Sequence, residues 1–263
     1  QGFDHHPVVN GPSMSTPFKF GTEFLVNTTT DSFQDVPSIT ALADGRFVVT
    51  WSDSSATGGD TSGVAIRAQV FNADGSKSGT EFLVNTTTTN NQNTPSITAL
   101  ADGRFVVTWE DLSISGGDTS SLAVRAQLFN ADGSKSGTEF LVNTTTTSAQ
   151  FNPSITALAD GRFVVAWEDN SGSGGDISGG AVRAQVFNAN GSKSGTEFLV
   201  NTTTTGAQNT PSITALADGR FVVTWEDYSF SGGDISGAAV RAQVFNANGS
   251  KSGSEFLVNT TTN

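Results

Sequence analysis

The chain has 263 residues, no cysteine and a formal net charge of −12. The lack of cysteine excludes disulfides and thiol chemistry. The acidic balance, with a pI near 4.4, argues against nucleic acid as a partner. No apolar run approaches the length of a membrane span, so the sequence also predicts no membrane insertion.

Residues 1–20 are predicted to form an N-terminal arm, and residues 21–263 a single repeat domain. The chain begins with Gln1, which we interpret as a mature N-terminus after export or as a leader before Met14. The only histidines, His5 and His6, could bind a metal as a pair, but an exposed arm or a tag remnant is the preferred interpretation.

A 58-residue repeat dominates the rest of the chain. The phrase PSITALADGRFVVTW occurs four times, with Ala166 replacing threonine in the third copy, and the tag EFLVNTTT occurs five times. A unit this short rarely buries its own apolar face, so the repeats are expected to pack on one another. The long phrase begins at Pro37, Pro95, Pro153 and Pro211, and the tag begins at Glu23, Glu81, Glu139, Glu197 and Glu255.

Each repeat is predicted to contain four short strands. In the first repeat the strands are expected at Ser38–Leu42, Arg46–Trp51, Val64–Phe71 and Glu81–Asn85. The dipeptide Asp44-Gly45 between the first two is a strong hairpin signal. The strands are rich in β-branched and aromatic residues, and no segment shows a sustained helical period.

Four antiparallel strands every 58 residues predict an all-β fold, a four-bladed β-propeller with one surplus terminal strand. Tandem sandwiches are disfavoured because 58 residues cannot supply seven strands, and a β-solenoid needs a much shorter coil. The four tryptophans are expected to pack between blades. The predicted buried set, with its 58-residue equivalents, is Ile39, Leu42, Phe47, Val49, Trp51, Ile66, Phe71, Phe82 and Val84.

The pattern EFLVNT…Q…PSITALADGRFVVTW…GGD…AQVFNADG resembles the tandem repeats of very large secreted bacterial proteins, which often also carry RTX-type calcium-binding or cadherin-like segments. The resemblance covers residues 19–263 and implies secretion and a surface or matrix role. It does not imply one activity. The GGxGxDxUx nonapeptides of RTX segments are absent here, so their calcium dependence is not carried over.

Differences between the repeats concentrate in the loop after each tryptophan and in the segment before each proline. Both are expected on the same rim of the propeller, and binding usually resides in loops. Exposed apolar or aromatic side chains there could stack on sugars or contact a protein. Alternatively, these side chains fold back and cover their own loop. A third interpretation is that the loop sequences vary because nothing constrains them. The predicted ligand-binding residues are Leu112, Ile114, Asn170, Tyr228 and Phe230.

Acidic residues recur in the same loops, and they allow two interpretations. Carboxylates beside a Gly-Gly turn could hold calcium, which takes oxygen ligands. Alternatively, each Asp accepts N–H groups of its own turn. No other cofactor is predicted. The candidate calcium ligands are Asp53, Asp60, Asp111, Asp118, Asp169, Asp176, Asp227 and Asp234, and Glu110, Glu168 and Glu226 lie beside them in the sequence.

The sequence predicts that the chain is not an enzyme. The acids are repeated around the ring, whereas catalytic sites usually break symmetry. The repeats contain no histidine or cysteine. Each arginine occupies one of two repeated positions, which predicts structural pairing with neighbouring acids.

The fifth tag leaves one strand without a blade, and an unpaired apolar strand tends to associate. It could pack as an extra edge strand on its own ring, be the cut end of a longer array, or add to the next molecule and build a filament. The leading hypothesis is an extracellular or cell-surface structural or adhesive propeller that polymerises through its N-terminal arm. The alternative is a multivalent glycan-binding module that uses the variable rim. The predicted partners are therefore other copies of the chain or glycans, and the predicted assembly residues are Phe24, Leu25, Val26, Phe256, Leu257 and Val258.

Overall fold

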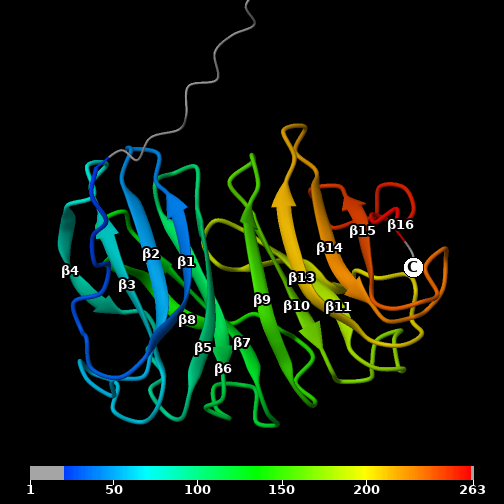
Figure 1. The fold of residues 1–263 in the computed structure, drawn as a ribbon, viewed down its shortest axis with the longest axis horizontal. Coiled ribbons are helices and arrows are strands. Elements are labelled where there is room, and N and C mark those ends of the chain that lie inside the picture. The colour runs from blue at the N-terminus through cyan, green and yellow to red at the C-terminus, as the bar shows by residue number, and fades with distance from the viewer. Residues whose placement is uncertain (1–20, 262–263) are drawn as a thin grey trace, which may run out of the picture.

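The structure, a computed structural model, describes residues 21–261, which form sixteen strands and no helix. The strands make four four-stranded antiparallel sheets, each with its strands in sequence order. The predicted four-bladed, all-β propeller is therefore confirmed (Figure 1). No helix in the described range is long and apolar enough to span a bilayer. The predicted arm, with His5 and His6, lies outside the described residues.

Each blade follows one repeat. The first blade contains β1 (Gln34–Ala41), β2 (Phe47–Asp53), β3 (Ala65–Phe71) and β4 (Lys77–Leu83). The other blades contain β5 (Gln92–Ala99), β6 (Phe105–Asp111), β7 (Ala123–Phe129) and β8 (Lys135–Leu141); β9 (Gln150–Ala157), β10 (Phe163–Asp169), β11 (Ala181–Phe187) and β12 (Lys193–Leu199); and β13 (Gln208–Ala215), β14 (Phe221–Asp227), β15 (Ala239–Phe245) and β16 (Phe256–Leu257).

The Asp-Gly hairpin forms as predicted. Leu42 N–H donates to the Arg46 carbonyl at 2.7 Å, and Gly45 has a φ of 87°, which glycine adopts without strain. The outer strand differs from the prediction, because β4 begins at Lys77 rather than at Glu81. A bulge in the pairing of β3 with β4, near the left-handed Gly79, extends the ladder into the predicted turn.

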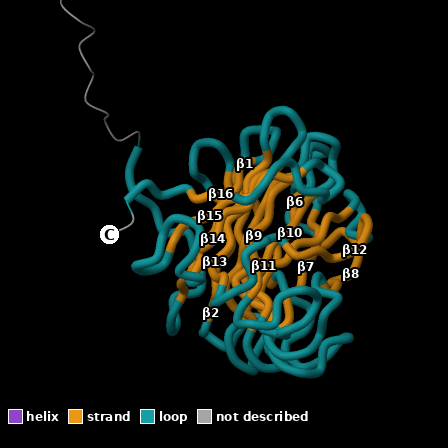
Figure 2. The backbone as a smooth tube through the Cα atoms, turned by 90° about the vertical axis from the view of Figure 1, so that its right-hand side faces the viewer, coloured by secondary structure: helices purple, strands orange, loops and turns teal. Residues whose placement is uncertain are grey.

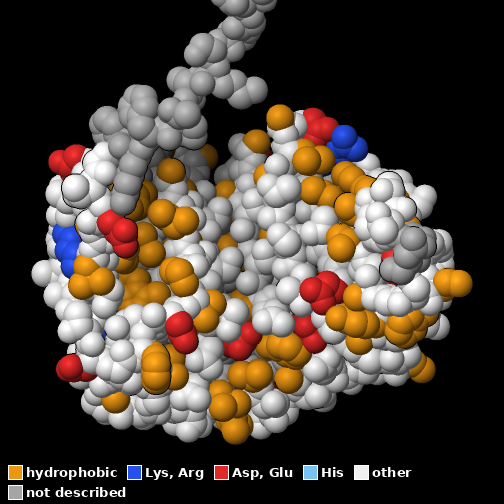
Figure 3. All heavy atoms as spheres, in the orientation of Figure 1, with side chains coloured by type: hydrophobic (Ala, Val, Ile, Leu, Met, Phe, Trp, Pro, Cys, Tyr) orange, Lys and Arg blue, Asp and Glu red, His pale blue; other side chains and the backbone are white. Residues whose placement is uncertain are grey.

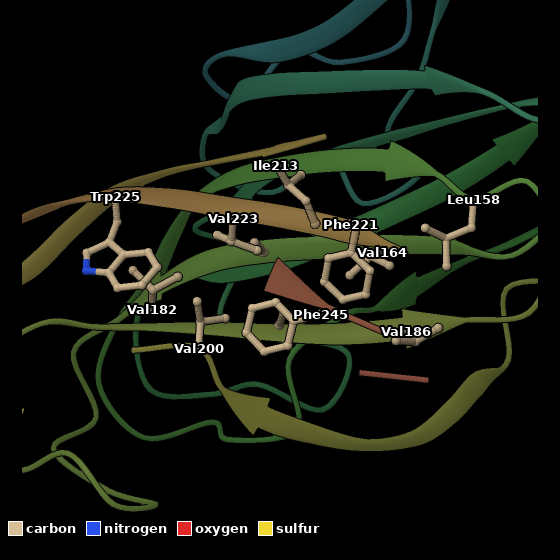
Figure 4. Close-up of a cluster of buried hydrophobic side chains, with 12 residues drawn as sticks. Leu158, Val164, Val182, Val186, Val200, Ile213, Phe221, Val223, Trp225 and Phe245 are labelled. Atoms are coloured by element: carbon tan, nitrogen blue, oxygen red, sulfur yellow. The ribbon is translucent and has the colours of Figure 1, made fainter. Parts of the chain in front are cut away.

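The hydrophobic core lies between successive blades. Trp225, Val223 and Phe221 of the fourth blade pack against Val182 and its neighbours in the third (Figure 4). The same arrangement joins the first blade to the second and the second to the third. The predicted packing of tryptophan between blades is therefore confirmed.

Within residues 21–261, the repeated interface is absent between the fourth blade and the first. Each core cluster of the described residues that spans two blades joins neighbours along the chain. Ile39 is 64% exposed, whereas its equivalent Ile97 is 6% exposed. The prediction that Ile39 is buried is therefore wrong, because no preceding blade covers it. Figure 3 looks into this opening and shows hydrophobic side chains on both sides of a central hollow.

The surplus tag is the N-terminal one. Glu255–Asn259 supplies β16 of the fourth blade, whereas residues 23–27 join no sheet. Val26 packs instead on the open face of the first blade, against Val49, Trp51 and Phe71. The surplus segment thus lies on the face of its own first blade, and not as the extra edge strand that the sequence allowed.

Candidate functional site

The two ends of the blades differ in their loops. One end carries the tight Asp-Gly and Asn-Gly turns, and the other, here called the long-loop rim, carries residues 54–64, 112–122, 170–180 and 228–238. In Figures 1 and 2 the long-loop rim is the lower end of the molecule. The segments that enter β5, β9 and β13 reach the same rim, as predicted from the repeat.

The first aspartate of each long loop holds the loop in place. Asp53 accepts from Arg67 Nε at 2.5 Å, from Ser55 Oγ at 2.7 Å and from Gln34 Nε2 at 3.0 Å. Burial acts to raise the pKa of Asp53, but the hydrogen bonds from Ser55, Gln34 and Arg67 outweigh it and keep that pKa below its ordinary value. Asp111, Asp169 and Asp227 make the same ion pair with Arg125, Arg183 and Arg241. The predicted structural role of these arginines is confirmed.

The second aspartate of each loop ties it to the outer strand. Asp60 accepts from Asn85 Nδ2 at 2.8 Å and from Ser62 N–H at 3.1 Å. Asp118, Asp176 and Asp234 bond Asn143, Asn201 and Asn259 in the same way. In residues 21–261, no cluster of three or more His, Asp or Glu side chains is placed to hold a metal. Calcium binding at these aspartates stays a prediction. A rise in Tm on addition of calcium would support it, provided that the rise is lost in Asp118→Asn.

The glutamates beside these aspartates form a different feature. Glu110, Glu168 and Glu226 lie one residue before the ends of β6, β10 and β14, which places them near the long-loop rim. The side chains of Glu110 and Glu168 point to the first strand of the next blade, which is its inner strand, rather than into their own loop; Glu226, in the last blade, instead accepts a hydrogen bond from Tyr228 of its own loop. Asn152 N–H donates to Glu110 Oε1 at 2.8 Å, and Thr210 N–H donates to Glu168 Oε2 at 3.3 Å. We call these three residues the glutamate row.

A bulge in each inner strand makes these contacts possible. Thr94, Asn152 and Thr210 have φ between 51° and 53°, and the ladder to the second strand shifts at that point. The bulge takes one N–H out of the ladder, and the carboxylate of the preceding blade accepts it. In the first blade the glutamate is replaced by Ser52, whose Oγ accepts from Thr94 N–H at 3.3 Å. The first blade therefore keeps the hydrogen bond to the N–H of the bulge in the next blade but lacks the carboxylate charge.

The glutamate row is partly withdrawn from water. Glu110 and Glu168 are 9% and 6% exposed. Burial raises the pKa of Glu110, against hydrogen bonds from Asn152 and Thr94. Burial also raises the pKa of Glu168, and the charges of Glu110 and Glu226 add to that rise. Figure 3 shows acidic side chains across the lower part of the hollow, on the side of the long-loop rim.

Asn152 connects two members of the row. Its backbone N–H binds Glu110, and its side-chain Nδ2 donates to Glu168 Oε2 at 3.3 Å. At the far end of the row, Tyr228 donates its hydroxyl to Glu226 Oε2 at 3.2 Å. Because of this hydrogen bond and the charge of Glu226, the pKa of Tyr228 is raised. One surface thus offers carboxylates, an amide and a phenol.

The predicted ligand-binding residues lie on this rim with different exposure. Phe230 is 56% exposed and Ile114 is 49% exposed, both at a left-handed φ of 52°. Tyr228 and Asn170 are also exposed, whereas Leu112 is half-buried. Only Tyr228 is brought into contact with the glutamate row. Two exposed isoleucines of the same rim, Ile177 and Ile235, were not predicted. The third and fourth repeats have isoleucine where the first two have threonine, and this difference between the repeats could have indicated them.

The predicted assembly residues lie at the two open ends of the array. Phe24, Leu25 and Val26 line a 280 Å³ groove on the first blade together with Pro37 and Trp51. Phe256, Leu257 and Val258 lie at the outer edge of the fourth blade. The two groups are thus on opposite sides of the opening, and their part in assembly stays a prediction.

The comparisons with known proteins concern the fold. No protein-family model matches the chain, and no curated protein matches it. Among solved structures, it is similar to a Penicillium chrysogenum α-L-arabinanase complexed with arabinobiose (17% identity, 84% of this chain and 66% of that one, TM-score 0.58). It is also similar to a GH93 α-L-arabinofuranosidase of Fusarium graminearum with arabinobiose (11%, 86% and 66%, TM-score 0.55) and to a Dyadobacter fermentans protein of unknown function (12%, 83% and 67%, TM-score 0.55).

At these identities the likeness shows the fold alone, and the chain spans about two thirds of the length of these neighbours. The prediction that the chain is not an enzyme is nevertheless contradicted, because the neighbours include an arabinanase and an arabinofuranosidase. That prediction assumed that repeated acids cannot form a site. The structure places Glu110, Glu168 and Glu226 close enough that the charges of Glu110 and Glu226 raise the pKa of Glu168.

Proposed function

We propose that the chain binds an oligosaccharide in the hollow at the long-loop rim. The observation that carries this proposal is the glutamate row, three carboxylates of successive blades that meet the Asn152 amide and the Tyr228 hydroxyl. Sugar hydroxyls both donate and accept hydrogen bonds, so a surface of carboxylate, amide and phenol groups suits them. The exposed ring of Phe230 offers an apolar face for stacking.

The repeat explains why an extended glycan suits this surface. The second, third and fourth blades present the same carboxylate at the same repeat position, so successive sugar units would meet successive blades. The fold neighbours include two proteins in complex with arabinobiose. We therefore take arabinobiose as the first probe and a glycan array as the wider search.

The test uses changes that the repeat itself tolerates. Glu168→Ser copies Ser52 of the first blade, and Asp74→Asn copies Asn190 of the third. Titration calorimetry with arabinobiose, or with a glycan found on the array, should show binding that Glu168→Ser and Tyr228→Ala weaken at least about tenfold, in line with the loss of a hydrogen-bonding partner. Asp74→Asn, at the opposite end of the blade, should bind as the parent does. No binding on the array would overturn the proposal.

Hydrolysis of a glycosidic bond is a second candidate function at the same row. The observation that favours it is the raised pKa of Glu168 beside Glu110 and Glu226. A protonated carboxyl that donates to the glycosidic oxygen and a second carboxylate that acts on the other side of the sugar are the two groups glycoside hydrolysis needs. In this assignment Glu168 is the acid, and Glu110 or Glu226 the second carboxylate.

The two candidates separate in one assay. Release of reducing ends from linear arabinan should fall at least about a hundredfold in Glu168→Gln, while binding of the glycan persists. If the parent binds a glycan but releases no reducing ends, the hydrolase candidate fails and the binding proposal stands.

An extracellular or cell-surface location, with an adhesive role, fits a chain that binds glycans. It is supported by the absence of cysteine and the net charge of −12, and by the resemblance to secreted bacterial repeat proteins. Detection of the chain on intact cells of the producing organism with an antibody would test the location. Signal only after lysis would contradict it.

A further inference from the structure

The two faces at the opening are the two halves of one repeated interface. The first-blade face consists of Ile39, Phe47, Val49, Trp51 and Phe71. In the second blade the equivalents of these residues lie in a core cluster with Leu42, Val48, Ile66, Val70 and Val84 of the blade before. The fourth-blade face consists of the corresponding residues Leu216, Val222, Val240, Val244 and Val258.

The fourth-blade face is uncovered. Val240 and Val258 are 39% and 47% exposed, whereas Val182 and Val200 at the same repeat positions are fully buried. On the first-blade face, Pro37 is exposed although Pro95, Pro153 and Pro211 are buried. Each face therefore lacks the partner that its counterpart has three times within the chain.

The surplus segment shows that the first-blade face retains this geometry. Phe24 meets Phe71 with ring centroids 5.5 Å apart and planes at 46°, and Phe82 meets Phe129 with the same values. Thr28 N–H donates to Glu81 at 2.6 Å, as Thr86 does to Glu139. Residues 24–28 thus occupy, on the first blade, the position that the end of β4 occupies on the second.

We propose that the fourth-blade face of one copy docks on the first-blade face of a second copy. The contact continues an interface that the chain already makes three times. By the pattern of the third and fourth blades, Val240 would lie beside Trp51, and Val222 and Val244 would lie toward Phe47 and Phe71 (Figure 4). The contact joins unlike faces, so it generates a head-to-tail chain or a ring of copies. This proposal is independent of glycan binding.

Docking brings two copies of one sequence to one position. Residues 23–30 of one copy and residues 255–262 of the other read EFLVNTTT in both cases. β16 has two residues, whereas β12 has seven. The proposal therefore assigns the edge of β15 to residues 23–27 of the neighbouring copy, in place of β16.

Complementary variants of the full chain test the contact. Ile39→Asp blocks the first-blade face and Val240→Asp blocks the fourth-blade face, each at an exposed residue that the fold does not need buried. Analytical ultracentrifugation over a concentration series should show association of the parent that each variant weakens at least about tenfold. Ile177→Asp, on an exposed loop residue away from both faces, should associate as the parent does.

The mixture of the two variants gives the decisive result. Ile39→Asp retains a good fourth-blade face and Val240→Asp a good first-blade face, so together they should form a dimer that cannot grow. A parent that stays monomeric at every concentration, or a mixture that stays monomeric, would overturn the proposal. A variant that still forms dimers alone would show contact between like faces and overturn it as well.

A crosslink tests the strand exchange separately. Ala242 pairs with Phe256 in β16, so exchange would bring Phe24 of the neighbour to Ala242. The chain has no cysteine, and Phe24→Cys mixed with Ala242→Cys should give a covalent heterodimer on oxidation. If the copies associate but the crosslink does not form, the strand exchange is refuted, while the docking of the two faces still stands.

Discussion

Asn152 N–H donates to Glu110 Oε1 at 2.8 Å across the boundary between the second and third blades. The donor is free for this bond because Asn152 lies in a bulge with a φ of 51°. A single repeated backbone irregularity thus fixes the direction of an acid of the preceding blade. The same relationship between Thr210 and Glu168 makes the row regular from blade to blade.

Loss of this row's charge should change how stability depends on pH. The folded-state pKa of Glu168 is raised by burial, so the folded chain binds its proton more tightly than the unfolded chain. Stability from this group is complete below the ordinary pKa of 4.5 and is lost as pH rises through the folded-state pKa. Glu168→Gln should therefore gain stability relative to the parent above that window and not below it.

Urea denaturation of parent and variant across the acid-to-neutral range measures this effect. Asp74→Asn, on the opposite rim, is a control of opposite sign, because hydrogen bonds from Ser76 lower the pKa of this exposed carboxylate and its stabilising effect is lost as the pH falls. A constant difference between Glu168→Gln and parent at every pH would contradict the raised pKa.

The buried ion pairs should matter far more than the exposed ones. Arg125 and Asp111 are 2.5 Å apart with side chains 5% and 1% exposed. Arg125→Met leaves the carboxylate of Asp111 buried without its cation, which should lower the free energy of unfolding by about 3–5 kcal/mol. Arg104→Met breaks an exposed pair with Asp102 and should cost about 1 kcal/mol or less. Chemical denaturation of both variants checks the order, and equal losses would contradict it.

The open fourth-blade face predicts unequal effects of one substitution at equivalent positions. Val182 is fully buried between the third and fourth blades, and Val240 is 39% exposed at the same repeat position. Val182→Ala should lower the free energy of unfolding by about 2 kcal/mol, from lost burial and the cavity left behind. Val240→Ala should cost about 1 kcal/mol or less. The measurement needs dilute protein, because self-association would bury Val240. If both variants lose a similar free energy of unfolding in dilute solution, the fourth-blade face is covered within one chain, which would contradict the prediction.

The hydrogen-bonded Tyr228 should report on its neighbour. Its pKa is raised by Glu226 through a hydrogen bond and a like-charge interaction. Glu226→Gln should lower that pKa towards its ordinary value of 10.0, because the negative charge that disfavours tyrosinate is removed. Ultraviolet titration can follow the change directly, since Tyr228 is the only tyrosine in the chain. An unchanged titration would show that the hydroxyl does not meet this carboxylate.

The amino-acid sequence by itself determined the number of blades, the four strands of each blade and the tryptophans between them. These features follow from local periodicity, turn residues and a 58-residue repeat, all of which can be identified along the sequence without knowledge of tertiary contacts. It also predicted the structural role of Arg67 and its equivalents, since a charge on a strand of mostly apolar residues needs a partner.

The tertiary structure decided which acids matter and where the array is open. Asp111 and Glu110 are neighbours in the sequence, yet one meets Arg125 of its own blade and the other meets Asn152 of the next blade. Successive side chains of a strand point to opposite faces, and only the packing of blades shows what lies on each face. The exposure of Ile39, whose sequence setting matches that of the buried Ile97, likewise depends on a neighbouring blade and not on the residues around it.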